Sequence, residues 1–521
     1  MLDALVQALG DIFSFGPLLG MLIVLPIALI SGLTPGGALP VSAVILSLAG
    51  VLDPYIAAVV IVFNNAASDI TKPITSILMG IPGDRSSQAT VLDGYPMARR
   101  GEAGIAIGAS YSVSLVGGLF GALVLLASLP LARTIIPAFG SPEFFLLSLL
   151  GIVSVAALST GAMSKGMLAA AFGILLATVG LAPTGGAVRG DFGSSYLFDG
   201  FELVPIVIGL FALPELIEMA VAKTSISGRD AQRSLAESKA QVREGMRIGL
   251  SHKWLLLRSS FIGTAVGLMP GVGGSAAHWI AYSSARATVK DGKKTFGKGD
   301  VRGVIAAESS NNSSDGGVLI PTLVFGLPGS GGTAILLSVL IVGGYTPGPD
   351  MVGVNLDVTM GMLLALVLGN IVVVPIMLYA GPWITRLTDV RAELLAAPLI
   401  AIVLLSAFTT TYDMADFFVV IAFTVLGLFM KRYGWPRPPI LLAIVLTPLL
   451  EKYMNIAFAT YGWSMLQRPA FLGILTVFAV GAVLSRLVNR VKSRTIEDTA
   501  LAGATTVPLT TDLSPSEVEK K

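Results

Sequence analysis

The chain has 521 residues, of which 54% are hydrophobic and only 13% are charged. Soluble domains carry about 25% charged residues, so this composition excludes an ordinary soluble protein. The net charge of +2 gives no sign of a nucleic-acid partner. Cysteine is absent, which excludes disulfides, iron–sulfur clusters and thiolate metal sites, and the two histidines, His252 and His278, form no metal motif.

Apolar stretches recur along the whole chain, and a membrane span needs about 20 apolar residues. Several stretches are shorter or are cut by glycine and proline, which is typical of broken helices and re-entrant hairpins. We therefore predict an all-α polytopic membrane protein with about 10–14 membrane segments. In chain order the stretches are 16–31, 104–129, 141–159, 164–182, 201–222, 254–269, 357–380, 392–410, 414–430, 437–450 and 468–485.

Two polar loops carry an excess of lysine and arginine, at 223–253 and 286–302, and such an excess marks the cytoplasmic side. The alternation of charge after residue 350 also places the C-terminus in the cytoplasm. The N-terminus has neither a basic region nor an Ala-x-Ala cleavage site, so we expect no signal peptide and a retained first span.

The chain is predicted to divide at the first basic loop. Residues 1–222 form one membrane half, 223–253 a basic cytoplasmic connector, 254–494 the second half, and 495–521 a disordered cytoplasmic tail. The connector is expected to be an amphipathic helix that joins the halves or docks a partner.

A sequence motif occurs once in each half. The first copy contains Gly32-Leu33-Thr34-Pro35-Gly36, Asn64-Asn65, Ser68-Asp69 and Gly80-Ile81-Pro82-Gly83. The second contains Gly267-Leu268-Met269-Pro270-Gly271, Asn311-Asn312, Ser314-Asp315 and Gly326-Leu327-Pro328-Gly329. Interrupted segments at corresponding positions of two halves are the best sequence indication of a transporter's binding site. We predict two pseudo-symmetric repeats, with inversion of one against the other as a hypothesis.

Polar side chains at membrane depth are costly unless they face a cavity or one another. Carboxamide and hydroxyl oxygens are hard ligands that suit Na⁺, and the free N–H groups of broken helices suit carboxylates. The predicted ion-coupling residues are Asn64, Asn65, Asp69, Asn311, Asn312 and Asp315. The predicted substrate-binding residues are Pro35, Gly36, Ser68, Thr71, Lys72, Pro82, Gly83, Ser86, Pro270, Gly271, Ser313, Ser314, Pro328, Gly329 and Ser330.

Several of these assignments have alternatives. The motifs as a whole are either a site inside the membrane or loop caps at its surface. Lys72 is either a counter-charge for an anionic substrate, or else a snorkelling lysine or a partner of Asp69. His278 is either part of a proton relay or a packed histidine, and Glu308 either joins an ion path or pairs with a basic loop residue. No phosphate-binding loop is present, so an ion gradient of Na⁺ or H⁺ is the expected energy source, with no cofactor.

The chain resembles the large membrane subunit of tripartite tricarboxylate transporters over nearly its whole length. The most specific element is Asp93-Gly-Tyr-Pro-Met-Ala-Arg99, within 80–101. Further matching stretches are 308–321, 326–329, 346–349 and, more weakly, 446–453. The first copy departs from the family pattern, because 64–72 is less glycine-rich than expected, and the transported carboxylate stays open.

The resemblance implies a permease that works with a small integral-membrane subunit and a periplasmic solute-binding protein. Its substrate would be a carboxylated organic anion such as citrate, carried by alternating access, in which one rigid unit moves past another as in an elevator. A stand-alone carboxylate permease without a receptor is one alternative. An intramembrane enzyme using Asp69, Asp93, Glu308 and Asp315 is another, but none of these four residues stands in an Asp-x-x-Asp metal cluster.

Overall fold

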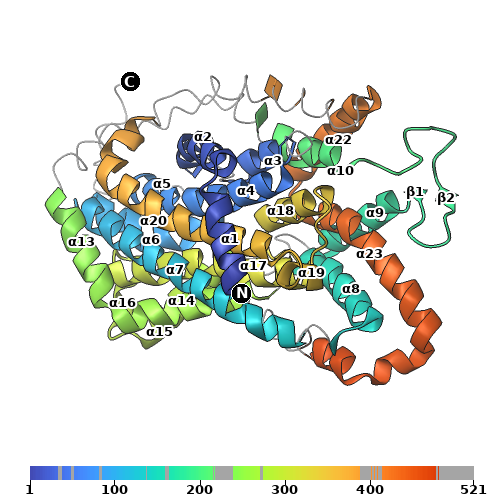
Figure 1. The fold of residues 1–521 in the computed structure, drawn as a ribbon. Helices are drawn as coiled ribbons and strands as arrows, with labels where there is room; N and C mark the ends of the chain where they lie inside the picture. The colour runs from blue at the N-terminus through green and yellow to red at the C-terminus, as the bar shows by residue number, and fades with distance from the viewer. Residues whose placement is uncertain are drawn as a thin grey trace, which may run out of the picture.

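The computed structural model describes residues 1–32, 38–47, 52–80, 85–135, 138–158, 163–214, 216–217, 239–269, 274–387, 400–401, 404, 408, 413–476 and 479. Residues 223–238 of the connector and the predicted tail lie outside these ranges. The described residues are mostly helical (Figure 1). One two-stranded antiparallel ribbon, β1 (Gly180–Leu181) with β2 (Val188–Arg189), is the exception to the predicted all-α fold within these residues.

The first half begins with α1 (Leu2–Ile12), followed by the apolar helix α2 (Phe15–Gly32). The motif region holds α3 (Leu39–Ser47), α4 (Pro54–Thr71), α5 (Pro73–Met79), a 3-10 turn η1 (Arg85–Ser87) and α6 (Gln88–Arg99). Then come α7 (Ala103–Ile135), α8 (Ser141–Leu158), α9 (Met163–Ala177), α10 (Leu203–Val207) and the π-helical η3 (Ile208–Ala212).

The second half begins with α13 (Lys239–Ser251) and α14 (Lys253–Gly267). Its motif region holds α15 (Gly274–Thr288), α16 (Gly292–Thr295), α17 (Val301–Phe325) and α18 (Gly331–Val342). The remaining helices are α19 (Pro349–Val352), α20 (Leu356–Leu387), α22 (Ala415–Arg432), α23 (Pro438–Tyr461) and the 3-10 segment η4 (Gly462–Gln467). α13 confirms a helix in the second part of the predicted connector.

Among the described residues, four helical segments are long and apolar enough to cross a membrane: Phe15–Gly32, Ala103–Ile135, Leu356–Tyr379 and Pro438–Gln467. Four shorter apolar helices accompany them, at Ser141–Val153, Met163–Ala177, Leu203–Ala212 and Gly331–Val342. A multi-pass membrane protein with short, interrupted helices is therefore confirmed. The count of 10–14 segments stays a prediction, since 392–410 and 468–485 lie largely outside the described residues.

The centre of the structure is α17, a helix that apolar patterning does not reveal. It is buried on every side although it carries a run of serine, asparagine and acidic residues from 308 to 315. It packs mainly against α7, α14 and α15 (Figure 1). Polar residues are tolerated here because α17 is enclosed by protein rather than lipid.

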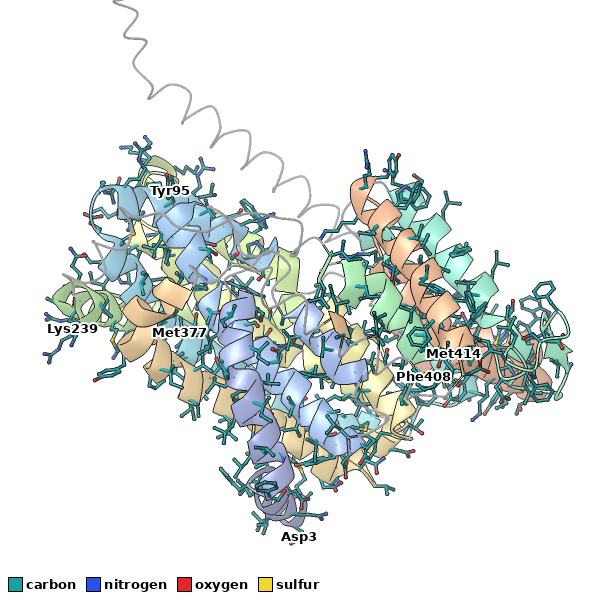
Figure 2. All side chains as sticks on the ribbon, turned by 90° about the horizontal axis from the view of Figure 1, so that it is seen from above. Asp3, Tyr95, Lys239, Met377, Phe408 and Met414 are labelled. Carbon is teal, nitrogen blue, oxygen red and sulfur yellow. The ribbon has the colours of Figure 1, made fainter. Side chains whose placement is uncertain are left out.

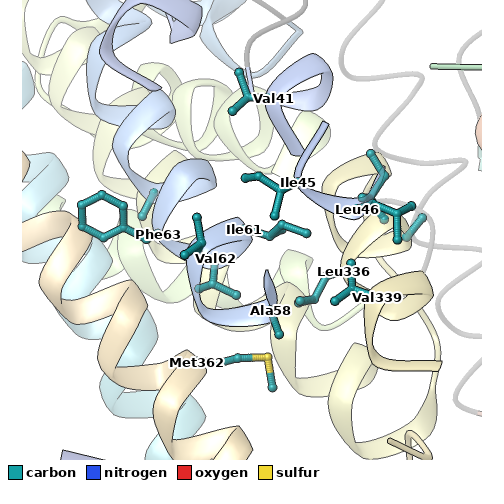
Figure 3. Packing of buried hydrophobic residues seen from close by; sticks show 14 of the residues in the cluster. Val41, Ile45, Leu46, Ala58, Ile61, Val62, Phe63, Leu336, Val339 and Met362 are labelled. Atoms are coloured by element: carbon teal, nitrogen blue, oxygen red, sulfur yellow. The ribbon is translucent and has the colours of Figure 1, made fainter. Parts of the chain in front are cut away.

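The main apolar core joins helices of both halves. Val41, Ile45 and Leu46 of α3 lie with Ile61 of α4 and Leu336 of α18 (Figure 3). Separately, α8, α9 and α23 pack on one another. Viewed from above, a group of helices that includes the start of α22 at Met414 lies to one side of the rest (Figure 2). The core in Figure 3 therefore holds the two motif regions together.

Candidate functional site

Equivalent glycines of the two copies make the same helix contact. A Cβ atom added at Gly32, the last residue of α2, would lie 2.6 Å from the carbonyl oxygen of Ser68 in α4. A Cβ atom added at Gly267, the last residue of α14, would lie 2.6 Å from the carbonyl oxygen of Ser314 in α17. Small residues let helix backbones approach this closely. The sequence repeat is thus a repeat of local packing, while the inverted relation between the halves stays a prediction.

The two motif helices also end in the same way. Gly80 ends α5 with φ 68°, and Gly326 ends α17 with φ 67°. This left-handed conformation is available to glycine without the steric cost that a side chain brings. After Gly326 the chain breaks over Leu327, Pro328 and Gly329 and starts α18. The predicted break at Pro328-Gly329 is therefore a real interruption between two helices.

Asn64 and Asn65 on α4 bind the first turns of α3. The Nδ2 atom of Asn64 donates to the carbonyl oxygen of Ala38 and to the hydroxyl of Ser42, both at 3.1 Å. The Ser42 hydroxyl in turn donates to Oδ1 of Asn65, also at 3.1 Å. Asn64 is fully buried, and its Oδ1 has no hydrogen-bond partner among the described residues.

Asn312 in α17 has the same property. Its Nδ2 atom lies 3.4 Å from Oδ1 of Asn370 in α20, while its own Oδ1 has no hydrogen-bond partner in the described part of the chain. Both asparagines are fully buried. A buried carbonyl oxygen without a donor is uncommon, and a bound ion or an ordered water is the usual way to satisfy it. Each copy therefore supplies one buried carboxamide oxygen that is available to a cation.

Asn370 is a residue that the sequence analysis missed. It lies inside the long apolar helix α20, where one polar side chain among hydrophobic neighbours is the only signal. A Cβ atom at its neighbour Gly369 would lie 2.8 Å from Ala66 of α4, while Asn370 itself contacts Gly118 of α7 and Asn312. α20 therefore connects the motif helices of both copies.

The N-terminus of α18 lies against the first copy. Ser330 caps it, because its hydroxyl accepts from the Thr333 backbone N–H at 3.2 Å and the Thr333 hydroxyl accepts from the Ser330 N–H at 3.0 Å. A Cβ atom at Gly332 would lie 3.0 Å from Nδ2 of Asn65. Free N–H groups at a helix N-terminus favour anions. Asn65 and Ser330, predicted from different copies, are brought to one place.

The charged residues of the first copy pair with each other. Lys72 and Asp69 form a salt bridge with both side chains largely buried. This geometry matches the alternative in which Lys72 neutralises Asp69. Burying either charge alone is expensive, so the pair explains how both are accommodated inside the bundle.

The side-chain hydroxyls that were predicted to bind substrate form hydrogen bonds with nearby groups of the protein. Thr71 donates to the Ser68 carbonyl at 2.9 Å, Ser313 to the Ser260 carbonyl at 2.8 Å, and Ser314 to the Asn311 carbonyl at 2.6 Å. The Ser68 hydroxyl lies 2.9 Å from that of Ser31. These groups stabilise helix contacts and retain mainly acceptor capacity for a ligand.

The remaining predicted residues have separate positions. Ser86 is half-buried in η1, Asp315 is half-buried on α17, and a Cβ atom at Gly329 would lie 3.5 Å from the Gly267 carbonyl oxygen. Asn311 is buried on α17. Six further predicted residues lie outside the described part of the chain: Pro35, Gly36, Pro82, Gly83, Pro270 and Gly271.

Asp93 holds the loop before α17. Its Oδ1 accepts from the backbone N–H groups of Gly297, Gly299 and Asp300 at 2.8, 2.9 and 2.8 Å, and its Oδ2 accepts from the Tyr282 hydroxyl at 2.9 Å. Burial raises the pKa of the Asp93 carboxyl to about 6, and the hydrogen bonds from the loop oppose that rise. The family-like element at 93–99 therefore has a structural role, since it joins α6 of the first half to the second half.

Comparisons with known proteins show what the chain is similar to. The chain matches the model of the tripartite tricarboxylate transporter TctA family over residues 18–442. It is 30% identical over 390 residues to an uncharacterized 52.8 kDa protein in the TAR-I ttuC′ 3′ region of Agrobacterium vitis, which covers 74% of this chain and 75% of the relative. It is 29% identical over 196 residues to an uncharacterized protein in the TAR-II ttuC′ 3′ region of the same organism, which covers 37% of this chain and 80% of the relative. No solved structure matches.

Proposed function

Because the chain belongs to the tripartite tricarboxylate transporter TctA family, we propose that it is the permease for a carboxylated organic anion such as citrate. A gradient of Na⁺ or H⁺ drives uptake across the bacterial inner membrane. A periplasmic solute-binding protein delivers the anion, and a small integral-membrane subunit completes the complex. Membership of this family makes the chain a subunit of a membrane transporter. The transported anion, the coupling ion and the partner subunits are what we propose.

The observation that carries this proposal is the pair of buried carboxamide oxygens on Asn64 and Asn312, one in each copy of the motif. Oxygen ligands of this kind suit a hard cation such as Na⁺. The N-terminus of α18 beside Asn65 supplies N–H groups for a carboxylate. A cation bound near that carboxylate lowers the cost of moving an anion into a low-dielectric site, which gives a physical reason for coupling.

Alternating access would move one group of helices past another. The contacts that differ between the two states would include those at Gly32 and Gly267, where helices touch backbone to backbone. Substrate and ion would bind in one state and be released in the other, so the affinity of each depends on the other.

The test is uptake of labelled citrate into proteoliposomes that contain the chain and its small membrane partner. It is run with and without the receptor, under an imposed Na⁺ or proton gradient. We expect uptake only with the receptor and with one of the gradients. Receptor-independent uptake would instead establish a stand-alone permease, and the absence of citrate uptake would direct the search to other carboxylates.

The site is tested with Asn312→Ala and Asn64→Ala. Loss of one oxygen ligand costs about 1–2 kcal/mol, which weakens the apparent ion affinity about 10-fold and the substrate affinity with it. Asn455→Ala is the matched control, because Asn455 is exposed and donates only to Thr184 among the described residues. Wild-type ion dependence in folded Asn312→Ala and Asn64→Ala protein would show that the site is assigned wrongly.

A further inference from the structure

An arginine near the start of α14 has one edge of its guanidinium without a partner in the described part of the chain. Arg258 is half-buried, and its Nη1 atom donates to the Thr288 hydroxyl of α15 at 2.6 Å. Its Nε and Nη2 atoms are buried and have no hydrogen-bond partner among the described residues. We propose that Arg258 belongs to a binding site for the phosphate group of an anionic phospholipid. This site goes beyond the transport function proposed above and does not depend on it.

The chemistry of this free edge favours an oxyanion. A guanidinium is always protonated and carries five N–H donors in a fixed plane. Buried donors of a charged group are costly to leave unpaired. Nε and Nη2 present two parallel N–H bonds, which is the geometry that two oxygens of one phosphate or carboxylate accept. No salt bridge between described residues includes Arg258, so within that part of the chain no carboxylate occupies this place.

The position of Arg258 on α14 favours a lipid over a soluble anion. Trp254 lies one helical turn before it and Phe261 about one turn after it, so both flank it on the surface of the helix. Trp254 is 86% exposed and Phe261 is 65% exposed. In a membrane protein such exposed apolar side chains face lipid, and tryptophan prefers the height of the headgroups. Arg258 therefore borders the lipid-facing surface of α14 close to the headgroups.

Positive charge gathers at this end of the α14–α15 pair. The bond from Arg258 to Thr288 joins the start of α14 to the last residue of α15, so the segment after α15 begins at the same end. Residues 289–298 of that segment include four exposed lysines and one aspartate. This excess predicts that the end is cytoplasmic. Basic pockets between helices on that side of a membrane bind anionic lipid headgroups, because each basic residue near the surface adds attraction.

Binding requires only a local movement of one long side chain. When the flexible stem of Arg258 turns the free edge towards Trp254 and Phe261, two phosphate oxygens accept from Nε and Nη2. The acyl chains of the lipid then cover Phe261, and the lipid holds α14 and α15 together. Since α14 also packs on α17 through Gly263 and Gly267, a lipid bound here stabilises the helices next to the second motif.

The first test measures lipid binding directly. The purified protein in micelles is titrated with phosphatidylglycerol, which is anionic, or with phosphatidylcholine, which has a phosphate but no net charge, and bound lipid is counted by native mass spectrometry. We expect Arg258→Gln to weaken phosphatidylglycerol binding by at least about 10-fold, because charge-assisted hydrogen bonds are lost. Arg432→Gln is the matched control and should bind like the wild type, because Arg432 is an exposed arginine in the last turn of α22.

Three results of this titration would overturn the proposal. Equal phosphatidylglycerol binding by Arg258→Gln and Arg432→Gln would show that Arg258 does not hold the lipid. Equal binding of both lipids by the wild type would show that an anionic headgroup is not selected. Inorganic phosphate and citrate are added as soluble competitors, and displacement of phosphatidylglycerol by either one at the concentration of the lipid would assign the free edge to a soluble anion.

The second test uses wild-type protein, so it does not depend on the folding of a variant. Phosphatidylglycerol with a photoactivatable headgroup is reconstituted with the protein in proteoliposomes, and the cross-linked peptides are identified by mass spectrometry. We expect cross-links concentrated in residues 253–261 and 284–290. Cross-links spread evenly over the lipid-facing helices would contradict a defined site. Neither test requires transport, so a failure of the proposed uptake leaves both results decisive.

Discussion

The close contact at Gly267 leads to a quantitative prediction about the packing of α14 on α17. A Cβ atom there would lie 2.6 Å from the Ser314 carbonyl oxygen and 3.1 Å from Cα of Gly317 and from N of Val318. An ordinary contact begins at 3.4 Å, so the shortfall to the carbonyl oxygen is 3.4 − 2.6 = 0.8 Å. All three neighbours are backbone atoms, so no side chain can rotate away.

Gly267→Ala must therefore push the two helices apart. Overpacking of this kind costs about 1–3 kcal/mol. Alanine is favoured over glycine in a helix by up to about 1 kcal/mol, but this gain is smaller at the last residue of α14. We expect a net loss of about 1–2 kcal/mol in the free energy of unfolding.

The measurement is equilibrium unfolding of the purified protein in mixed micelles. Gly10→Ala is the control, because no heavy atom lies within 4 Å of the position of its Cβ. It should be neutral or slightly stabilising, since Gly10 lies inside α1. The argument from packing fails if Gly267→Ala stays within about 0.5 kcal/mol of the wild type.

Three further outcomes are expected. Burial raises the pKa of the Asp93 carboxyl to about 6 in the folded protein. The contribution of this carboxyl to the free energy of unfolding is therefore full below about pH 4 and is lost as the pH rises through about 6. Thermal unfolding of Asp93→Asn should lack this pH dependence. Arg468→Ala leaves the buried Glu143 without its partner and should cost about 2 kcal/mol in the same unfolding assay, a value reduced because Arg468 is partly exposed. Lys72→Ala should destabilise more than the double variant Lys72→Ala/Asp69→Ala, because the single change leaves a buried charge; equal losses would contradict the pairing.

Much of the membrane architecture could be predicted from the sequence. The apolar stretches at 16–31, 104–129 and 357–380 coincide with α2, α7 and α20, because length and hydrophobicity alone decide whether a helix fits the bilayer. The repeated glycines at Gly80 and Gly326 end their helices as left-handed caps, which follows from local backbone preference. Family membership also follows from local stretches, of which 93–99 is the most specific.

The site could be predicted only in part. The two motifs pointed to the asparagine pairs Asn64-Asn65 and Asn311-Asn312, because polar residues that recur in two halves of an apolar chain indicate a binding site, and their role there stays a prediction. Asn370 was missed, since its helix is otherwise apolar and its neighbours come from α7 and α17. The choice between roles for Lys72 also needed the tertiary structure, because a lysine three residues after an aspartate can turn towards it or away from it.

The sequence by itself determined that this chain is a helical membrane protein with a repeated, interrupted motif. These properties depend on composition and on local backbone preference, both of which are present in any short stretch of the chain. Only the tertiary structure decided which buried side-chain oxygens accept a hydrogen bond and which have no donor among the described residues. It also brought the Thr90 hydroxyl of α6 to the Glu308 carboxyl of α17. These contacts join residues far apart in the sequence, and their existence depends on how closely the helices pack, which glycine contacts such as that at Gly267 control.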